Sequence, residues 1–137
     1  FAQLLPYFEH EARFAHGGVT EANASKIPEK YHDSDPKALV AAFDAGEFPI
    51  LVGTSCIATG TNIRSVRTML YLQGGQSDIQ VRQAIGRTTR LFEGKTGCNI
   101  FDFDVWNQDC VHRHAQQRIA IYNDLLPGSV KEIQYAL

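Results

Sequence analysis

Short segments dominated by apolar residues recur along the chain. Three of them lie at 49–54, 67–72 and 98–103. A mainly apolar run of this length is typical of a β-strand that is buried on both faces of a sheet. A fourth and shorter strand is expected at 12–15, just before the turn residues His16-Gly17-Gly18.

Between these strands the sequence carries the signals of helices. Ser34-Asp35-Pro36 combines a capping side chain with a proline in the first turn, and Gly46 is a typical residue just after a helix end. These signals predict a helix over 37–45. We also expect helices over 78–91 (entered at Ser77 or Asp78) and 108–125, the end of a helix over 1–8, mostly loop over 19–36, and a short helix or strand over 129–137.

Strands that alternate with helices favour parallel βαβ connections and a three-layer α/β fold around a parallel sheet. The 137 residues, 44% hydrophobic and 20% charged, suit one globular domain, which we expect over 1–126 with a tail at 127–137. No apolar run is long enough to cross a membrane. The cysteines have no metal- or disulfide-type spacing, which favours a reducing setting and three small buried thiols, Cys56, Cys98 and Cys110.

Charge is distributed unevenly, although the formal net charge is only −2. Residues 64–95 contain six basic and two acidic side chains, whereas the rest of the chain contains seven basic and thirteen acidic ones. A positive band in an otherwise acidic domain indicates a local site for a polyanion.

The densest polar pattern in this band lies at 83–90. On a helix, Gln83, Arg87 and Arg90 share one face, because they are spaced by four and three residues. Gly86 lies near that face and would let another surface approach closely. One amide and two guanidiniums make a donor array suited to phosphate oxygens, and an anion between the arginines would offset their repulsion. The alternative is a solvated basic helix face.

A second polar segment, 51–63, begins in a predicted buried strand. Ligands of open α/β sheets sit beyond the carboxyl ends of strands, where Thr54 and Ser55 can offer hydroxyls and N–H groups to a phosphate. Gly60 permits close backbone approach, and Asn62 offers an amide to a ribose or an ordered water. The same residue types are also common in an ordinary strand-to-helix turn.

Together and in this order, the two segments resemble motifs V and VI of superfamily-2 helicases and translocases. The motif VI pattern Q-x-x-G-R-x-x-R is matched in full by Gln83, Gly86, Arg87 and Arg90. Motif V is matched by Thr54, Gly60 and Asn62, with Asn62 where many members carry Asp. The stretches 16–18 and 42–48 also look like this family. The resemblance covers roughly residues 1–105 and is nearest to phage recombination and repair helicases.

This resemblance implies the second, C-terminal RecA-like lobe of an ATP-driven nucleic-acid motor, with ATP and Mg²⁺ held mainly by a first lobe. The sequence contains no G-x-x-x-x-G-K-[ST] motif. We therefore expect the chain to be part of a longer protein, without its N-terminal lobe and the first strand of its own sheet. By resemblance, Arg87 and Arg90 are arginine fingers, Gln83 orients or senses the γ-phosphate, and Gly60, Asn62 and Gly86 line the ATP cleft.

The resemblance also implies contacts with the backbone of a nucleic acid, DNA rather than RNA. Thr54 and Ser55 are the main candidates, and His16, Gly17 and Gly74 are weaker ones. The expected location is the cytoplasm of a bacterial or phage-infected cell, or another reducing intracellular compartment.

Two other classes of protein compete with this interpretation. A non-catalytic nucleic-acid-binding module is the main alternative, and the acidic remainder of the chain counts against it. A small α/β enzyme of the flavodoxin or phosphatase type would need its own phosphate loop or nucleophile after the first strand, and the sequence contains neither.

Polar and aromatic residues after position 100 have structural interpretations. Two histidines two apart on a helix cannot easily share a metal ion, so no metal site is expected. An exposed tryptophan could instead stack on a base. We expect His112 and His114 to bind no metal, Asp102 and Asp104 to form a polar face or cap a turn, Arg113 and Arg118 to lie on a solvated helix face, and Trp106 and Tyr122 to lie in the core or an interface.

Overall fold

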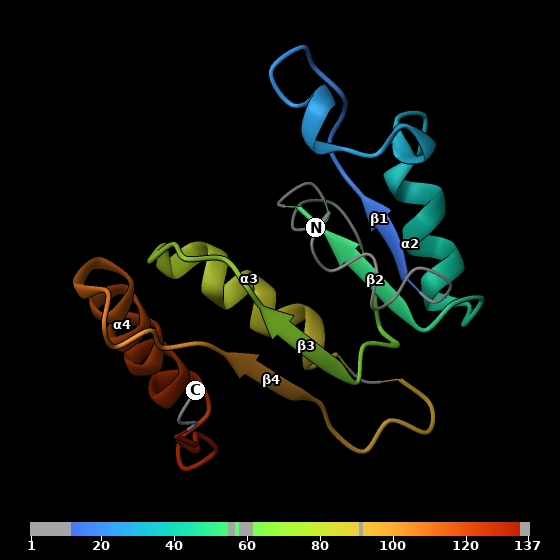
Figure 1. Ribbon diagram of the computed structural model, residues 1–137. Helices are drawn as coiled ribbons and strands as arrows, with labels where there is room; N and C mark the ends of the chain where they lie inside the picture. Colours follow the sequence, from blue (N-terminus) through green and yellow to red (C-terminus); the bar gives the residue numbers. More distant parts are fainter. Residues whose placement is uncertain (1–11, 55–56, 58–61, 91, 135–137) are drawn as a thin grey trace.

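The computed structural model describes residues 12–54, 57, 62–90 and 92–134. Strands and helices alternate along them as the sequence predicts, except that β3 is the next described element after β2 (Figure 1). The elements are β1 (Ala12–Ala15), α2 (Pro36–Asp44), β2 (Ile50–Gly53), β3 (Thr68–Tyr71), α3 (Asp78–Thr88), β4 (Asn99–Asp102) and α4 (Asp109–Leu125), with 3-10 turns at Ala24–Lys26 and Glu29–Tyr31. The predicted helix end at 1–8 lies outside the described residues, and 129–134 forms neither helix nor strand.

The strands pair in parallel, which confirms the predicted α/β class. Ala12 lies opposite Ile50 in the β1–β2 pair, and Thr68 lies opposite Asn99 in the β3–β4 pair. Among the described residues the four strands form two such pairs, because α2 and α3 each return the chain beside the strand just completed, whereas β2 and β3 are not paired. The four arrows run in the same direction in Figure 1, so the segments that follow the strands leave at the same edge.

Helix α2 shows how local chemistry sets the bounds of an element. The Asp35 carboxylate accepts a hydrogen bond of 2.9 Å from the N–H of Lys37, and Pro36 occupies the first turn. At the other end Gly46 has a φ of 82°, and the N–H groups of Gly46 and Glu47 donate back to the last turn. This is the Schellman arrangement that favours glycine, so the predicted helix end is confirmed.

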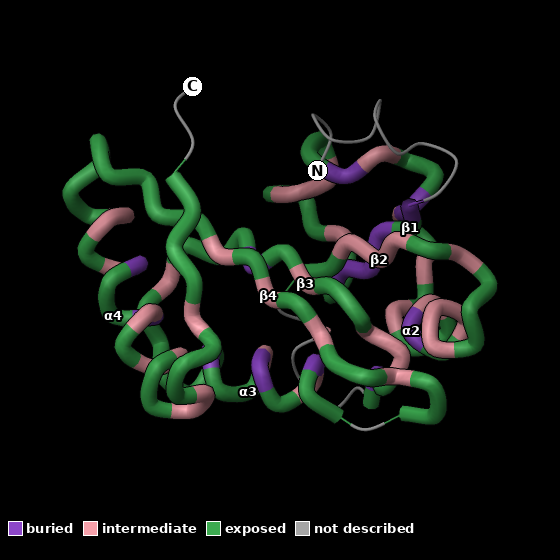
Figure 2. The backbone as a smooth tube through the Cα atoms, turned by 90° about the horizontal axis from the view of Figure 1, so that it is seen from below, coloured by how far each residue is buried: buried purple, intermediate pink, exposed green. Residues whose placement is uncertain are grey.

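Each strand pair has its own small core. Phe14 of β1 packs with Ile27 and Tyr31 from the loop that follows it. Tyr71 of β3 packs with Val81 and Ile85 of α3, and further apolar side chains from β4 and α4 close this second core. Buried positions accordingly gather along β1 and on the inner side of α3 in Figure 2.

The outer face of the β3–β4 pair corrects one prediction. Leu70 and Phe101 point away from α3 and α4 and are 58% and 47% exposed. The expectation that these strands are buried on both faces is therefore wrong for the described residues, since α3 and α4 cover only one face. Trp106 is exposed as well, so it does not belong to the core of this chain.

The cysteines also differ from expectation. Cys110 is exposed in the first turn of α4, and Cys98 is half-buried just before β4; both are free thiols. Burial was predicted from the apolar character of the thiol, but neither position faces a core. Cys56 lies outside the described residues.

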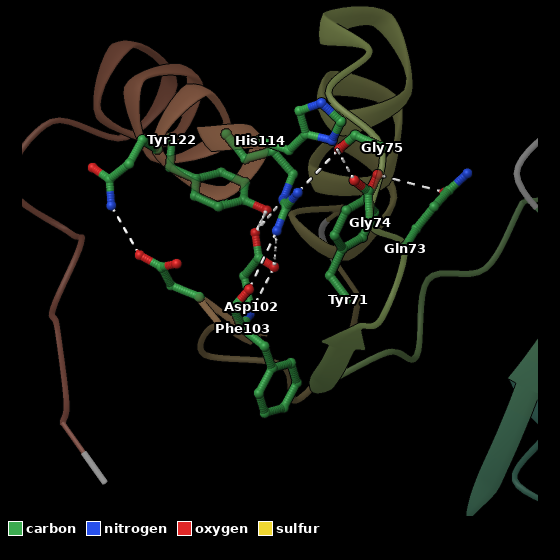
Figure 3. A network of polar contacts seen from close by, with 11 residues as sticks. Tyr71, Gln73, Gly74, Gly75, Asp102, Phe103, His114 and Tyr122 are labelled. Carbon is green, nitrogen blue, oxygen red and sulfur yellow. Dashed lines mark hydrogen bonds and ion pairs between the residues drawn. The ribbon is translucent and has the colours of Figure 1, made fainter. Parts of the chain in front are cut away.

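Arg118 of α4 is buried, so the predicted solvated position is wrong. Its guanidinium donates to both carboxylate oxygens of Asp102, at 2.7 and 2.9 Å, and to the carbonyl of Gly75 at 3.1 Å. The Tyr122 hydroxyl donates to the same carboxylate at 2.7 Å (Figure 3). The hydrogen bond to Asp102 raises the pKa of Arg118 above its ordinary value. One buried cation therefore joins the segment after β3 to the end of β4.

Replacement of Arg118 by Met should lower the free energy of unfolding by about 3–5 kcal/mol, because the Asp102 carboxylate is left without its cation. Chemical denaturation measures the effect, with Arg113→Met on the exposed side of α4 as the matched control. The control should stay within about 0.5 kcal/mol of the wild type. Equal effects of the two substitutions would contradict a structural role for the buried guanidinium.

Candidate nucleotide and nucleic-acid site

Helix α3 ends at Thr88, three residues before the predicted end. The hydroxyls of Thr88 and Thr89 both donate to the carbonyl of Ile85, at 2.9 and 3.1 Å, and such side-chain bonds compete with continued helix formation. Gln83 and Arg87 therefore share a helix face as predicted, whereas Arg90 lies in the segment that follows the helix.

This early helix end places Arg90 beside the other candidate segment. Its guanidinium Nη1 donates to Oδ1 of Asn62, a residue 28 positions earlier in the sequence. Both side chains are exposed. The structure thus brings together one predicted residue of the 51–63 segment and one of the 83–90 segment.

Arg87 is half-buried on α3. Burial lowers the pKa of its guanidinium, and the positive charge of Arg90 lowers it further. The positive charge of Arg90 therefore acts against the charge of Arg87. A multiply charged anion would relieve this repulsion and accept hydrogen bonds from both, so the donor set fits the phosphate groups of a nucleotide.

The side of α3 that carries Gln83 and Gly86 is exposed. A methyl group built in place of the Gly86 hydrogen would meet no atom within 4 Å. In the described part of the chain this face is open to an approaching surface, as the glycine predicts. Ser55 and Gly60, the other predicted residues of this site, lie outside the described residues.

The remaining nucleic-acid candidates are backbone positions after strands. Thr54 is exposed after β2, and its N–H donates to the carbonyl of Ala15 at 3.2 Å, which extends the β1–β2 pairing. Gly17 and Gly74 are exposed after β1 and β3. The carbonyl of Gly74 accepts a hydrogen bond of 3.0 Å from His114 (Figure 3). Each of these positions follows the carboxyl end of a strand. Because the strands run in the same direction, these ends lie at one edge, where ligands of α/β sheets bind.

His16 has a structural position instead. Its side chain is only 3% exposed. The N–H of Gly18 donates to Nδ1 at 3.2 Å, so Nε2 carries the proton and donates to the carbonyl of Tyr31 at 2.6 Å. Both ring nitrogens are thus engaged inside the domain, where His16 shapes the turn that presents Gly17. A contact of His16 with a nucleic acid stays a prediction.

Comparison with known proteins decides the family. The sequence profile of the helicase conserved C-terminal domain matches residues 4–92. The chain belongs to this helicase family. Its resemblance to superfamily-2 helicases through motifs V and VI is thereby confirmed, while the narrower assignment to phage recombination and repair helicases stays a prediction.

Two relatives extend this result. The Schizosaccharomyces pombe protein irc3, which bears the name of a mitochondrial ATP-dependent helicase, is 35% identical over 72 residues, covering 53% of this chain and 12% of that protein. The solved C-terminal domain of the DEAD-box protein Dbp5 aligns with a TM-score of 0.57 and 20% identity, covering 95% of this chain and 63% of that one. The Dbp5 likeness shows the fold, and this chain spans less than two thirds of either relative.

Three residues that support the site in this helicase domain carry no signal in the two motifs: Asp44, Lys95 and Arg118. Asp44 lies in the 42–48 stretch, but its partners are distant in sequence. Lys95 lies seven residues after Thr88, the end of α3, and a turn brings it back to the helix carbonyls, so its helix-end role cannot be read from its position in the sequence. The partners of Arg118 come from other elements and cannot be read from its own helix.

Asp44, the last residue of α2, holds the segment that carries Asn62. Its Oδ1 accepts hydrogen bonds from the N–H groups of Arg64 and Ser65, each at 2.8 Å. Burial by itself raises the pKa of Asp44, but these backbone donors and the charge of Arg64 outweigh it, and the pKa lies below the ordinary 3.8. The carboxylate of Asp44 therefore fixes residues 64 and 65, which directly follow the motif V segment.

An open depression beside this segment shares Asn62 with the candidate nucleotide site, but none of Gln83, Arg87 and Arg90 lines it. Its lining residues are Lys37, Val40, Ala41, Asp44, Ala45, Asn62, Arg64 and Phe92.

No three His, Cys, Asp or Glu side chains in the described part of the helicase domain lie close enough to hold a metal ion. His112 instead pairs with the Asp104 carboxylate at 2.8 Å. None of the described helices is long and apolar enough to cross a membrane.

Asp44→Ala should lower the free energy of unfolding by about 1–3 kcal/mol near neutral pH, because two backbone donors lose their acceptor. The lowered pKa also predicts that the contribution of this carboxylate is complete above pH 3.8 and is lost as the pH falls below it. Denaturation at several pH values measures both effects, with the exposed Asp33→Ala as control. A difference between the variants that persists unchanged in strong acid would contradict the assignment.

Proposed function

We propose that this chain is the C-terminal motor lobe of an ATP-dependent nucleic-acid helicase or translocase. Arg87 and Arg90 would serve as arginine fingers for ATP that is bound, together with Mg²⁺, mainly by an N-terminal lobe of the same polypeptide. The observation that supports this most strongly is the contact between Arg90 and Asn62. It joins the two motif segments beside Arg87, whose charge is disfavoured by the charge of Arg90.

The proposed chemistry is electrostatic. Hydrolysis of ATP supplies the free energy, and negative charge spreads over the oxygens of the transferred phosphoryl group. Guanidinium donors that bind this charge more strongly than the ground state accelerate the reaction, and such fingers are worth on the order of 10³–10⁵ in rate. Gln83 would orient or sense the γ-phosphate, while Gly86, Gly60 and Asn62 would line the cleft.

Contact with the nucleic acid is proposed for the edge at the carboxyl ends of the strands. Thr54 and Ser55, with the backbone at Gly17 and Gly74, would bind the sugar-phosphate chain. Contacts of this kind read no base sequence and weaken as salt concentration rises. DNA is the proposed substrate because the motif resemblance is nearest to recombination and repair helicases.

The proposed compartment is a reducing one, where Cys98 and Cys110 stay free thiols. The cytoplasm meets this condition, and so does the interior of an organelle such as the one named for irc3.

The finger assignment predicts the kinetics of two variants of the full-length protein. Arg87→Ala and Arg90→Ala should each lower kcat for nucleic-acid-stimulated ATP hydrolysis by at least about a hundredfold, with a much smaller change in ATP affinity, because the lost interaction belongs to the transition state. The exposed Arg113→Ala is the control for loss of one positive charge. Unchanged turnover in both variants would instead favour a non-catalytic nucleic-acid-binding module.

The nucleic-acid edge is tested by Thr54→Val, which keeps the shape of the side chain and removes its hydroxyl. Affinity for single-stranded DNA should fall by about tenfold or more, equally for different base sequences, because a hydrogen bond to a charged phosphate is lost. Filter binding or fluorescence anisotropy at fixed salt measures it. Thr68→Val is the matched control, because Thr68 lies at the amino end of β3 and therefore at the opposite edge. Equal losses of affinity in the two variants would contradict the assignment.

A further inference from the structure

Lys95 is brought back to the end of α3 by a tight turn. The N–H of Lys95 donates to the carbonyl of Phe92 at 3.0 Å, and Gly94 inside the turn has a φ of 72°, which favours glycine. The carbonyl of Gly94 also accepts a hydrogen bond of 3.3 Å from Arg67 Nη2, at the residue before β3. The turn is thus stabilised by a hydrogen bond within it and by a second one from Arg67.

The half-buried ammonium group of Lys95 meets three backbone carbonyls. It donates to Thr88, the last residue of α3, to Arg90 at 3.1 Å and to Arg64 at 3.3 Å. An ammonium group has three donors, and this arrangement gives each an acceptor. A solvated surface lysine would not converge on three carbonyls from two separate segments.

These contacts complete a closed connection between the two motif segments. On one side, the N–H of Arg64 is held by Asp44 and its carbonyl by Lys95. On the other side, the carbonyl of Arg90 is held by Lys95 and its guanidinium contacts Asn62. Without the ammonium group, the helix-end carbonyl of Thr88 loses a cation partner. Between the described residues of the two segments, the exposed contact of Asn62 with Arg90 is then the one polar link that remains.

We propose that Lys95 is a positioning residue for the Arg90 finger: it clamps segment 62–64 to segment 88–90 so that the guanidinium of Arg90 is presented in one fixed place. This proposal rests on the proposed function of Arg90 and adds a residue outside both motifs. Lys95 acts through Arg90 and does not itself touch the nucleotide. Its effect therefore depends on the presence of the Arg90 side chain.

The test uses the full-length protein and compares Lys95→Met, which keeps the aliphatic stem and removes the ammonium group, with Lys131→Met, a loss of the same charge at an exposed position. Lys95→Met should lower kcat for nucleic-acid-stimulated ATP hydrolysis by about ten- to a hundredfold with little change in KM, the scale that misplacement of a catalytic group produces. Lys95→Arg, which keeps charge and donors, should recover part of the loss. Lys131→Met should match the wild type.

Two further readouts separate positioning from general destabilisation. Hydrogen exchange in Lys95→Met should rise in segments 62–65 and 88–90 and stay unchanged in β2. In an Arg90→Ala background, Lys95→Met should cause no further loss of kcat, because the group that it positions is absent. If Lys95→Met fails to fold, Lys95→Gln, which keeps donors but loses the charge, serves the same comparisons.

The outcomes that overturn the proposal are distinct. A large loss in Arg90→Ala with none in Lys95→Met overturns the role of Lys95 and leaves the proposed function standing. If Lys95→Met lowers kcat by the same factor in the wild type and in the Arg90→Ala background, Lys95 stabilises the structure without positioning Arg90. Unchanged kcat in Arg90→Ala overturns the finger assignment itself, and the positioning role with it.

Discussion

The second half of the domain depends on one interaction, the buried ion pair between the guanidinium of Arg118 and the carboxylate of Asp102. Parallel strands bring their carboxyl ends to one edge, and the chain after β3 and the end of β4 both present oxygens there. The Asp102 carboxylate adds a full negative charge at this place, so a cation must neutralise it. Arg118 does so from α4 and thereby sets the position of the loop that carries Gly74 and Gly75.

The basic residues of the band at 64–95 fall into two groups. Those of the first group are bound to carbonyl or carboxylate oxygens of the protein, as Arg118 is. Lys95 turns inward and binds carbonyls. Arg82 forms an ion pair with Asp78 of its own helix and a second one with Asp124, which joins α3 to α4. The charge of Arg90 acts on Arg87 instead. The proposed site for a polyanion therefore rests on these two arginines, whose repulsion an anion would relieve, and not on the net charge of the band.

Local chemistry made much of the fold predictable from the sequence. The Asp35 cap, the Gly46 helix end and the apolar strands are encoded within a few residues, and the structure confirms them. Predictions failed where a distant partner decides. The burial of Arg118, which was expected on a solvated helix face, depends on Asp102 at the end of β4. The burial of His16 likewise depends on a distant group, the carbonyl of Tyr31. In the candidate site the residue types were predicted, but the position of Arg90 beyond the helix follows from Thr88, Thr89 and Lys95 acting together.

The central claim is that Arg87 and Arg90 bind the γ-phosphate of ATP held by another lobe. A structure of the full-length protein with a non-hydrolysable ATP analogue, Mg²⁺ and single-stranded DNA tests it most directly. The account predicts guanidinium nitrogens of both residues within about 2.7–2.9 Å of γ-phosphate oxygens when the lobes are closed. A closed complex in which both guanidiniums point to solvent or to the DNA, away from the nucleotide, would contradict it.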